Sequence, residues 1–313
     1  MKKVLSVSLG SSTRNHRVET EILGESFIIE RLGTDGDIKK AVQIIKKYDG
    51  KVDAFGMGGI NLYLKVNSKK YTLRSALPIQ NAAKKTPMVD GTGLKNSLER
   101  MVIDYLNREN IVDFKNKKVL ITSAIDRFGL AESLEKTEAE CIYGDVFYAL
   151  GIPYFLHSLT TLKRIAKILL PIVRHLPFKV LYPTGEKENE ESKENKTIEK
   201  IYKSVDIIAG DFLYIKQFMP ERLDNKIIIT NTITEANVRS LKEKGVRILI
   251  TTTPEFNGRS FGTNVMEGVL ITLAGKNYNN LTQQDYIDLL EKASFLPRII
   301  YLNDEYKKIE EKI

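Results

Sequence analysis

The sequence predicts an α/β protein with two domains, and three observations support this fold class. The chain has 313 residues, more than a single domain usually contains. Hydrophobic residues make up 42% of it, which is enough to fill two ordinary cores. Along the chain, short apolar runs typical of strands alternate with helical periodicities, a pattern that favours parallel sheets covered by helices. We therefore expect an N-terminal α/β domain followed by a domain built on a mainly parallel sheet.

The predicted first domain covers residues 1–115. A helix is expected over residues 37–47, because the apolar residues there repeat on a single face. A second helix, over residues 94–106, follows a break at Gly91 and Gly93 and would bridge the two domains. Strands are expected at residues 4–9, 27–32 and 52–56. This alternation is the pattern of βαβ units.

The second domain is predicted to cover residues 116–275, because the polar segment 113–118 separates it from the first. A helix over residues 235–244 would end at Gly245, since glycine favours the left-handed conformation of a C-cap. The run 186–196 is almost wholly charged or polar and is predicted to be a mobile surface loop. Strands are expected at residues 119–122, 141–143, 206–209, 227–230 and 248–251.

The composition argues against several classes of protein. A formal charge of +8 would suit nucleic acid or an anionic ligand. The lysines, however, are spread along the chain beside many glutamates, so we expect a solvated basic surface and no nucleic-acid partner. With Cys141 as the only cysteine and three histidines, the chain has little from which to build a disulfide or a metal site. We therefore expect a cytoplasmic protein without a metal.

Membrane insertion is not expected either. The most apolar stretch, residues 165–173, is interrupted by Lys167 and Pro171 and is shorter than the roughly 20 apolar residues that span a bilayer. The N-terminal apolar run is too short for a signal peptide. For the stretch 165–173, a helix packed against a sheet is the simpler interpretation, and a basic amphipathic helix on a membrane surface is the alternative.

One segment of the second domain predicts a nucleotide-binding unit. From residue 119 onward its order is strand, turn, helix, strand and acid, as in a Rossmann-like domain that binds a dinucleotide. Gly129 would let the helix pack closely on the strand, and Asp145 stands where an acid would bond the adenosine ribose. The turn would be lined by Ser123, Asp126 and Arg127. The arginine of this turn could pair with a phosphate.

A second segment, Asp90-Gly-Thr-Gly-Leu94, ends a short strand and opens the predicted bridging helix. It resembles the motif of shikimate and quinate dehydrogenases, in which an aspartate precedes a Gly-x-Gly-Phe/Leu turn. Residues 227–234 and the helix after them are similar to a late strand and helix of that family. The resemblance implies that the first domain binds substrate and the second binds a nicotinamide cofactor. It also implies that a C-terminal helical tail, residues 276–313, returns to the first domain.

The resemblance further implies roles for single residues. Lys65 and Asp90 would be the catalytic pair that takes the proton from a secondary alcohol. For each of them a structural role, as a surface lysine or a helix-capping acid, is the alternative. The substrate would be bound by Ser11, Ser12 and Asn61, with a structural role in a turn as the alternative for the two serines. The cofactor would be bound by the residues Ser123, Asp126, Arg127, Gly129 and Asp145 of the strand-turn-helix segment, by Asn231, and by Arg259 in a glycine-rich loop over residues 254–262.

The predicted function is that of an NAD(P)-dependent oxidoreductase, with hydride transfer from a secondary alcohol of a hydroxylated carboxylic acid. NAD is favoured over NADP, because the Asp145 carboxylate would repel a 2′-phosphate. Only one glycine of the dinucleotide fingerprint is clearly present, which supports an alternative from another class. That alternative is a non-redox Rossmann-like protein that binds a nucleotide or a phosphorylated metabolite. In both cases the expected partner is a small molecule. The sequence is also compatible with a homodimer.

Overall fold

The computed structural model describes residues 1–66, 69–177, 196–256, 259–275 and 281–303. The chain divides into two compact units, each assembled from three segments. Two of the unit boundaries fall inside helices, α3 (Thr92–Arg108) and α6 (Leu159–Val173). Unit 1 contains Met1–Leu98, Lys163–Glu190 and Phe261–Phe295, and unit 2 contains Glu99–Leu162, Glu191–Ser260 and Leu296–Ile313.

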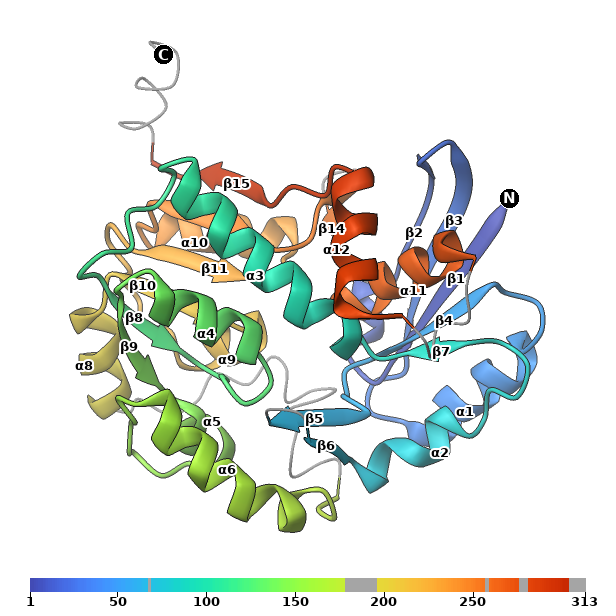
Figure 1. The fold of residues 1–313 in the computed structure, drawn as a ribbon, viewed down its shortest axis with the longest axis horizontal. Coiled ribbons are helices and arrows are strands. Elements are labelled where there is room, and N and C mark those ends of the chain that lie inside the picture. Colours follow the sequence, from blue (N-terminus) through green and yellow to red (C-terminus); the bar gives the residue numbers. More distant parts are fainter. Residues whose placement is uncertain (67–68, 178–195, 257–258, 276–280, 304–313) are drawn as a thin grey trace. The chain divides into compact units, whose positions relative to one another are not determined.

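Unit 1 is built on a five-stranded sheet with the order β2-β3-β1-β4-β7 (Figure 1). Its strands are β1 (Lys2–Ser8), β2 (His16–Ile22), β3 (Glu25–Gly33), β4 (Ala54–Gly58) and β7 (Met88–Val89). Neighbouring strands are parallel except for β2, which pairs antiparallel with β3. The helix α1 (Ile38–Tyr48) provides the crossover from β3 to β4, which lie parallel on either side of β1.

The two faces of this sheet differ in the size of their side chains, because successive residues of a strand point to opposite faces. On one face, large residues of β1 and β4 form a core with Ala41 and Ile45 of α1, among them Leu5, Val7, Phe55 and Met57. Apart from Val4, the alternate positions carry small residues, namely Ser6, Ser8, Ala54, Gly56 and Gly58. Their small size allows α11 (Thr263–Ala274) to lie close to β1 and β4.

The remaining elements of unit 1 are short. They are the hairpin of β5 (Tyr63–Val66) and β6 (Lys69–Thr72), the 3-10 helices η1 (Ser12–Arg14) and η2 (Arg74–Ala76), and the helices α2 (Leu77–Gln80) and α12 (Gln283–Lys292). The first turn of α12 is stabilised by a capping box, in which Thr282 and Asp285 each bond the backbone N–H of the other.

Unit 2 is built on a six-stranded sheet with the order β15-β12-β11-β10-β8-β9 (Figure 1). Its strands are β8 (Lys118–Ile121), β9 (Glu140–Tyr143), β10 (Ile207–Gly210), β11 (Ile227–Thr230), β12 (Ile248–Thr251) and β15 (Arg298–Tyr301), and only β15 is antiparallel to its neighbour. Its helices include α4 (Phe128–Lys136), α5 (Asp145–Leu150), α8 (Lys196–Ser204), α9 (Phe212–Phe218) and α10 (Glu235–Glu243). The three central strands β10, β11 and β12 are wholly buried, which explains their continuous apolar runs.

The structure confirms the α/β class with a mainly parallel sheet. The order of the strands, however, differs from that of the predicted Rossmann-like domain. The third strand of unit 2, β10, pairs with the first, β8. In a dinucleotide-binding Rossmann sheet the third strand instead lies outside the second. Unit 2 therefore has the strand order of the flavodoxin-like doubly wound sheets.

Most predicted elements are present. The strands β11 and β12 have the predicted bounds, and the predicted helices over residues 37–47 and 94–106 correspond to α1 and α3. The edge strand β2 was not predicted, because only Val18 and Ile22 of its seven residues are buried and it contains no continuous apolar run. The charged segment 186–196 lies outside the described residues except for Lys196, which begins α8.

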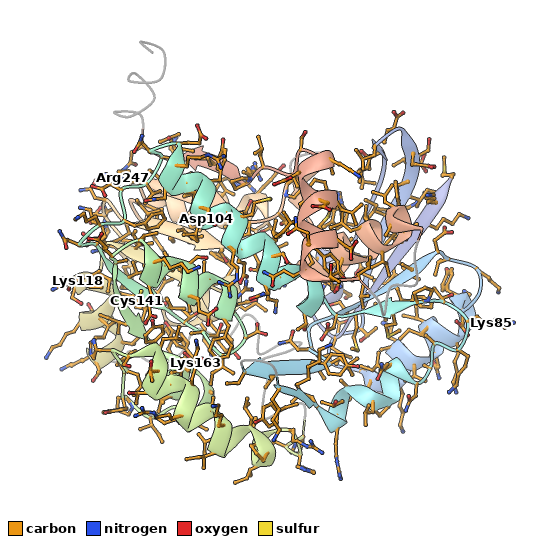
Figure 2. The ribbon with its side chains drawn as sticks, viewed as in Figure 1. Lys85, Asp104, Lys118, Cys141, Lys163 and Arg247 are labelled. Carbon is orange, nitrogen blue, oxygen red and sulfur yellow. The ribbon has the colours of Figure 1, made fainter. Side chains whose placement is uncertain are left out.

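Two features of the surface bear on the expectations from composition. Lys85 and Lys118 are exposed and project from the ribbon (Figure 2), as expected of a solvated basic surface. In the part of the chain that the structure describes, no helix has the length and apolar character needed to cross a bilayer.

Candidate functional site

The carboxyl ends of the parallel strands of unit 2 gather polar side chains. In doubly wound sheets, ligands bind outside these ends, at the point where successive strands are added on opposite sides of the first. In unit 2 this point lies between β8 and β10. The residues nearby are Asp126 and Arg127 after β8, Asp145 after β9, Asp211 after β10, Asn231 after β11, and Tyr214 of α9. We refer to these six residues as the strand-end cluster.

Arg127 is the cation of the strand-end cluster, and two carboxylates hold it. Its Nη1 donates to Glu99 Oε1, and its Nη2 donates to Asp211 Oδ2 over 3.3 Å. The side chains of Arg127 and Glu99 are 2% and 0% exposed. Burial opposes the charge of Arg127, but attraction to Glu99, Asp211 and Asp126 prevails and raises the pKa of Arg127. The guanidinium group is therefore engaged by carboxylates of its own chain.

Asp211 connects several parts of the strand-end cluster. Its Oδ2 accepts a hydrogen bond from Asn231 Nδ2 at 2.9 Å, in addition to the bond from Arg127. Its Oδ1 accepts from the backbone N–H of Leu213 at 2.9 Å, which makes Asp211 the N-cap of α9. The Asp211 side chain is 26% exposed, so its oxygens stay accessible to a further donor.

Asp145 is buried and fixes the turn that follows β8. Its Oδ1 accepts from the backbone N–H of Ile125 at 2.8 Å, and its Oδ2 accepts from that of Ala124 at 3.1 Å. Burial is the main cause that raises the pKa of Asp145 to about 7; these hydrogen bonds oppose the increase, and the charge of Asp126 adds to it. Tyr214 lies near the same carboxylates, whose charges add to burial in raising the pKa of its hydroxyl.

Three buried hydroxyl groups near these strand ends have no hydrogen-bond partner among the described residues. They belong to Thr122 and Ser123 after β8 and to Thr252 after β12. A buried polar group without a partner costs about 1–3 kcal/mol, so it indicates a site for a bound water or ligand. Gly210 is needed beside them, because its φ is +141° and a Cβ there would lie 2.1 Å from Thr122 Oγ1.

The region of the strand-end cluster has an excess of negative charge. The carboxylates of Glu99, Asp126 and Asp211 all act on the guanidinium of Arg127, and Asp145, which is only partly ionised near pH 7, lies beside Asp126. A phosphate or pyrophosphate would be repelled by this arrangement. A neutral ligand rich in hydroxyl groups would find both acceptors and donors.

The predicted catalytic aspartate, Asp90, is buried in unit 1 and holds backbone groups. Its Oδ2 accepts from the N–H groups of Leu62 at 2.6 Å and Tyr63 at 3.2 Å. Its Oδ1 accepts from the N–H of Thr92, in the first turn of α3, at 3.0 Å. Lys65 lies in β5, and its side chain is outside the described part of the structure. The pairing of Lys65 with Asp90 stays a prediction.

A second buried carboxylate, which the sequence did not reveal, lies near Asp90. This is Glu267 of α11, whose Oε2 accepts from the N–H of Gly91 at 2.6 Å and whose Oε1 accepts from the Tyr286 hydroxyl at 2.7 Å. Burial first, and the charge of Asp90 second, raise the pKa of Glu267 to about 7, while Lys95 acts in the opposite direction. No local pattern points to this contact, because 176 positions separate Gly91 from Glu267.

The other residues predicted in unit 1 lie after β1 and β4. Ser11 Oγ accepts from the backbone N–H of Thr13 at 3.2 Å, and the N–H of Ser12 donates to Asp35 at 2.7 Å. Asn61 is 9% exposed. The contacts of the two serines are those of a turn, and a substrate-binding role for these residues stays a prediction.

Two residues predicted to bind a cofactor remain. Gly129 lies buried in the first turn of α4. Arg259 lies in β14 (Arg259–Ser260), which pairs with β13 (Glu255–Phe256), and its side chain is outside the described part. Within the described residues, no group of three or more His, Cys, Asp and Glu side chains could hold a metal ion.

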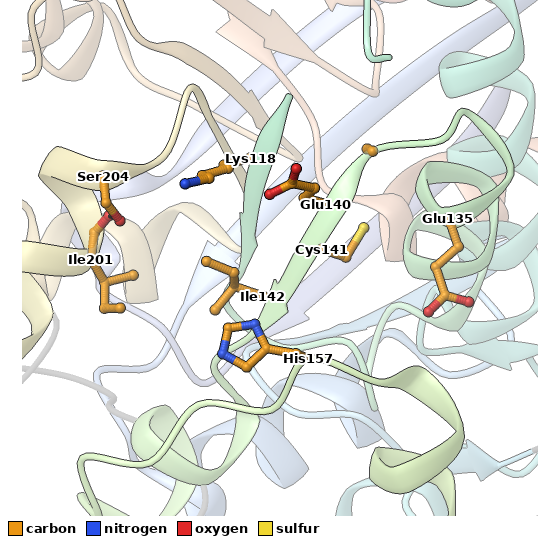
Figure 3. Close-up of a pocket in the computed structure, with 9 residues that line it drawn as sticks. Lys118, Glu135, Glu140, Cys141, Ile142, His157, Ile201 and Ser204 are labelled. Atoms are coloured by element: carbon orange, nitrogen blue, oxygen red, sulfur yellow. Dashed lines mark hydrogen bonds between the residues drawn. The ribbon is translucent and has the colours of Figure 1, made fainter. Parts of the chain in front are cut away.

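A groove with a volume of about 590 Å³ lies at the outer edge of β9 (Figure 3). Cys141 points to one side of the strand, and Ile142 points to the other (Figure 3). Burial is the main cause that raises the pKa of Cys141 to about 12, so the thiol stays protonated and is a poor nucleophile. Lys118 and Glu140, the first residues of β8 and β9, also line the groove. It therefore lies toward the opposite end of these strands from the strand-end cluster.

Comparison with protein families gives a direct assignment. Residues 93–302 match the model of a family described as Domain of unknown function (DUF8754), which covers more than half of the chain. The chain belongs to the DUF8754 family. In addition, residues 3–90 match the model described as Domain of unknown function (DUF8753). No curated protein matches this DUF8754 chain.

Several solved structures are similar to this DUF8754 chain over nearly their whole length. An arabinose-binding protein from Geobacillus stearothermophilus is 9% identical, with a TM-score of 0.42 and 96% of each chain covered. An ABC-transporter solute-binding protein from Burkholderia multivorans is 10% identical, with a TM-score of 0.39 and coverage of 96% of this chain and 99% of that one. A glucose-galactose-binding protein from Geobacillus stearothermophilus is 10% identical, with a TM-score of 0.37 and coverage of 97% and 98%.

The predicted resemblance to shikimate and quinate dehydrogenases is wrong, and so is the prediction of an NAD(P)-dependent oxidoreductase. Neither matching family model describes a dehydrogenase. The structure supplies physical reasons. Negative charge prevails where the pyrophosphate of NAD or NADP would lie, and Arg127 is engaged by Glu99. The Asp90 motif that carried the resemblance holds backbone groups at the start of α3.

Proposed function

We propose that this protein is a non-redox binding protein for a small, neutral molecule rich in hydroxyl groups, of the sugar or polyol class. The observation that carries the proposal is the strand-end cluster, where among the described residues the carboxylates outnumber the one guanidinium, and where the partly exposed carboxylate of Asp211 adjoins an amide and a phenol ring. This refines the non-redox alternative of the sequence analysis, since the excess of acids disfavours a nucleotide or a phosphorylated metabolite.

The chemistry of recognition follows from the accessible groups. Oδ1 of Asp211 accepts only the bond from Leu213, so it can accept a second hydrogen bond from a hydroxyl of a ligand, and bonds to a charged acceptor are stronger than neutral ones. The hydroxyl of Ser123, which has no partner among the described residues, can donate to a ligand oxygen. The ring of Tyr214 can cover the apolar C–H face of a sugar, as aromatic residues do in small-molecule sites.

The test is a calorimetric titration of the full chain with neutral sugars and polyols, phosphorylated sugars, NAD and NADP. We expect binding of a neutral member and none of the phosphorylated ones. Asp211→Asn should weaken that binding by about tenfold or more, because one acceptor oxygen becomes a donor. Asparagine is also a good N-cap, so α9 should persist. Mass spectrometry of the released ligand should show it chemically unchanged.

The matched control is Asp224→Asn in the same unit, which removes an exposed carboxylate that pairs with Arg222. The affinity of Asp224→Asn for the neutral ligand should equal that of the wild type. Binding confined to phosphorylated solutes or NAD(P), or equal losses in Asp211→Asn and Asp224→Asn, would overturn the proposal.

A further inference from the structure

A separate basic cluster lies in unit 1, where the chain leaving α6 meets η2. The backbone N–H of Arg74, the first residue of η2, donates to the backbone carbonyl of Arg174 at 3.0 Å. Arg174 follows the last residue of α6 directly. This bond therefore brings together two arginines that are far apart in the sequence, with Ser75 and His175 next to them.

The charges of this cluster are not balanced by the described residues. No carboxylate in the described ranges forms an ion pair with Arg74 or Arg174. Arg174 Nε and Ser75 Oγ are buried atoms that have no hydrogen-bond partner there. His175 is exposed, and partial desolvation first, with the charges of Arg74 and Arg174 second, lowers its pKa.

We propose that Arg74, Ser75, Arg174 and His175 form a binding site for an oxyanion of the phosphate class. A phosphate would neutralise two neighbouring guanidinium groups that otherwise repel each other. It would also accept from the Nε of Arg174 and the hydroxyl of Ser75, the two buried donors without a partner. Guanidinium groups suit this ligand because their N–H groups match the spacing of phosphate oxygens.

The phosphate can belong to a free solute or to a phospholipid headgroup. A phospholipid is considered beside a free solute because α6, the helix that leads to the site, exposes apolar as well as basic residues. Ile168 and Ile172 of α6 are 72% and 64% exposed, and Arg164 and Lys167 are exposed on the same helix. Exposed apolar residues beside basic ones are typical of helices that lie on anionic membranes.

The first experiment titrates inorganic phosphate into the full chain in a chloride buffer and follows the histidine imidazole signals by NMR. The sequence has only three histidines, and His175→Gln assigns the signal. We expect saturable changes at His175, with its pKa raised by about 1 unit, because a nearby anion favours the protonated ring. Arg74→Gln and Arg174→Gln should each reduce the affinity for phosphate by tenfold or more. Arg222→Gln, which alters an exposed arginine paired with Asp224, should change nothing.

The second experiment measures co-sedimentation with vesicles of phosphatidylcholine alone and with added phosphatidylserine. A lipid headgroup as the source predicts binding to the anionic vesicles only, and loss of binding in Ile168→Ser and Ile172→Ser as well as in Arg174→Gln. A free solute as the source predicts phosphate binding without vesicle binding. If phosphate leaves the His175 signal unchanged and the anionic vesicles bind no protein, or if the arginine variants respond like the wild type, the oxyanion site is refuted. The sugar site in unit 2 uses other residues and is unaffected by that outcome.

Discussion

At the scale of single residues, Arg127 depends on the carboxylates that hold it. Arg127→Met would remove the ion pair between Arg127 and the buried Glu99 carboxylate. Breaking a buried ion pair by removing one partner is strongly destabilising, so we expect a loss of about 3–5 kcal/mol in the free energy of unfolding, measured by urea denaturation. Arg222→Met is the control, since it breaks an exposed ion pair and should change stability little. Equal losses in the two variants would contradict this account of Arg127.

Glu267 gives a prediction of pH dependence at the same scale. The folded protein retains the proton of Glu267 up to about pH 7, whereas the unfolded chain releases it near the ordinary pKa of 4.5. The contribution of this group to stability is therefore complete below about pH 4.5 and is lost as the pH rises to about 7, by roughly 3 kcal/mol in total. Asp145 acts in the same direction, because its pKa is also raised to about 7.

The test for Glu267 compares unfolding free energies of the wild type and Glu267→Gln between pH 4.5 and 7.5. Glutamine can still accept from Gly91 and does not titrate, so the decrease with rising pH should become smaller in the variant. Parallel curves for the two proteins would show that Glu267 does not titrate in this range.

At the scale of elements, the distance between α11 and β1 is set by Gly268. A glycine inside a helix usually costs about 1 kcal/mol relative to alanine, so Gly268→Ala would ordinarily stabilise the protein. Here a Cβ would lie 2.8 Å from Val4 Cγ1, so the substitution should destabilise it, by about 1–3 kcal/mol. Val4→Ala should restore part of this loss in the double variant, because it removes the overlapping methyl group. Stabilisation by Gly268→Ala alone, measured by thermal unfolding, would refute the close packing.

At the scale of the whole molecule, Cys141 can report unfolding, since it is the only cysteine of the chain. The residue is 9% exposed, and the pKa of its thiol is raised to about 12. Because the thiolate is the reactive form, labelling of the folded protein at pH 8 should be slower than that of a free cysteine by a factor on the order of 10³. Labelling should reach the ordinary rate in denaturant. Fast labelling of the native protein would place the thiol in a more open setting than the groove at β9.

The sequence by itself determined the α/β class and most of the strands and helices. The bounds of β11 and β12 follow from continuous apolar runs, and those of α1 from the periodicity of one apolar face. These signals are local, because burial on both faces of a strand or on one face of a helix is reflected in consecutive residues. The sequence also placed Asp126, Arg127, Asp145 and Asn231 in one candidate site, since parallel strands present their carboxyl ends at the same edge.

Only the tertiary structure decided the chemistry of that site. The pairing of β10 with β8, and of Arg127 with Glu99 and Asp211, joins residues that no local pattern connects. The role of the motif at Asp90 was also decided only by the structure, in which its residues form and stabilise a turn. Gly91 has a φ of +90°, and the Asp90 carboxylate accepts hydrogen bonds from backbone N–H groups. A short motif records the residues that a turn requires, but charge balance and burial depend on segments distant in the chain. For this reason the sequence located the polar residues at the strand ends, and only the folded chain showed that their acids disfavour a dinucleotide.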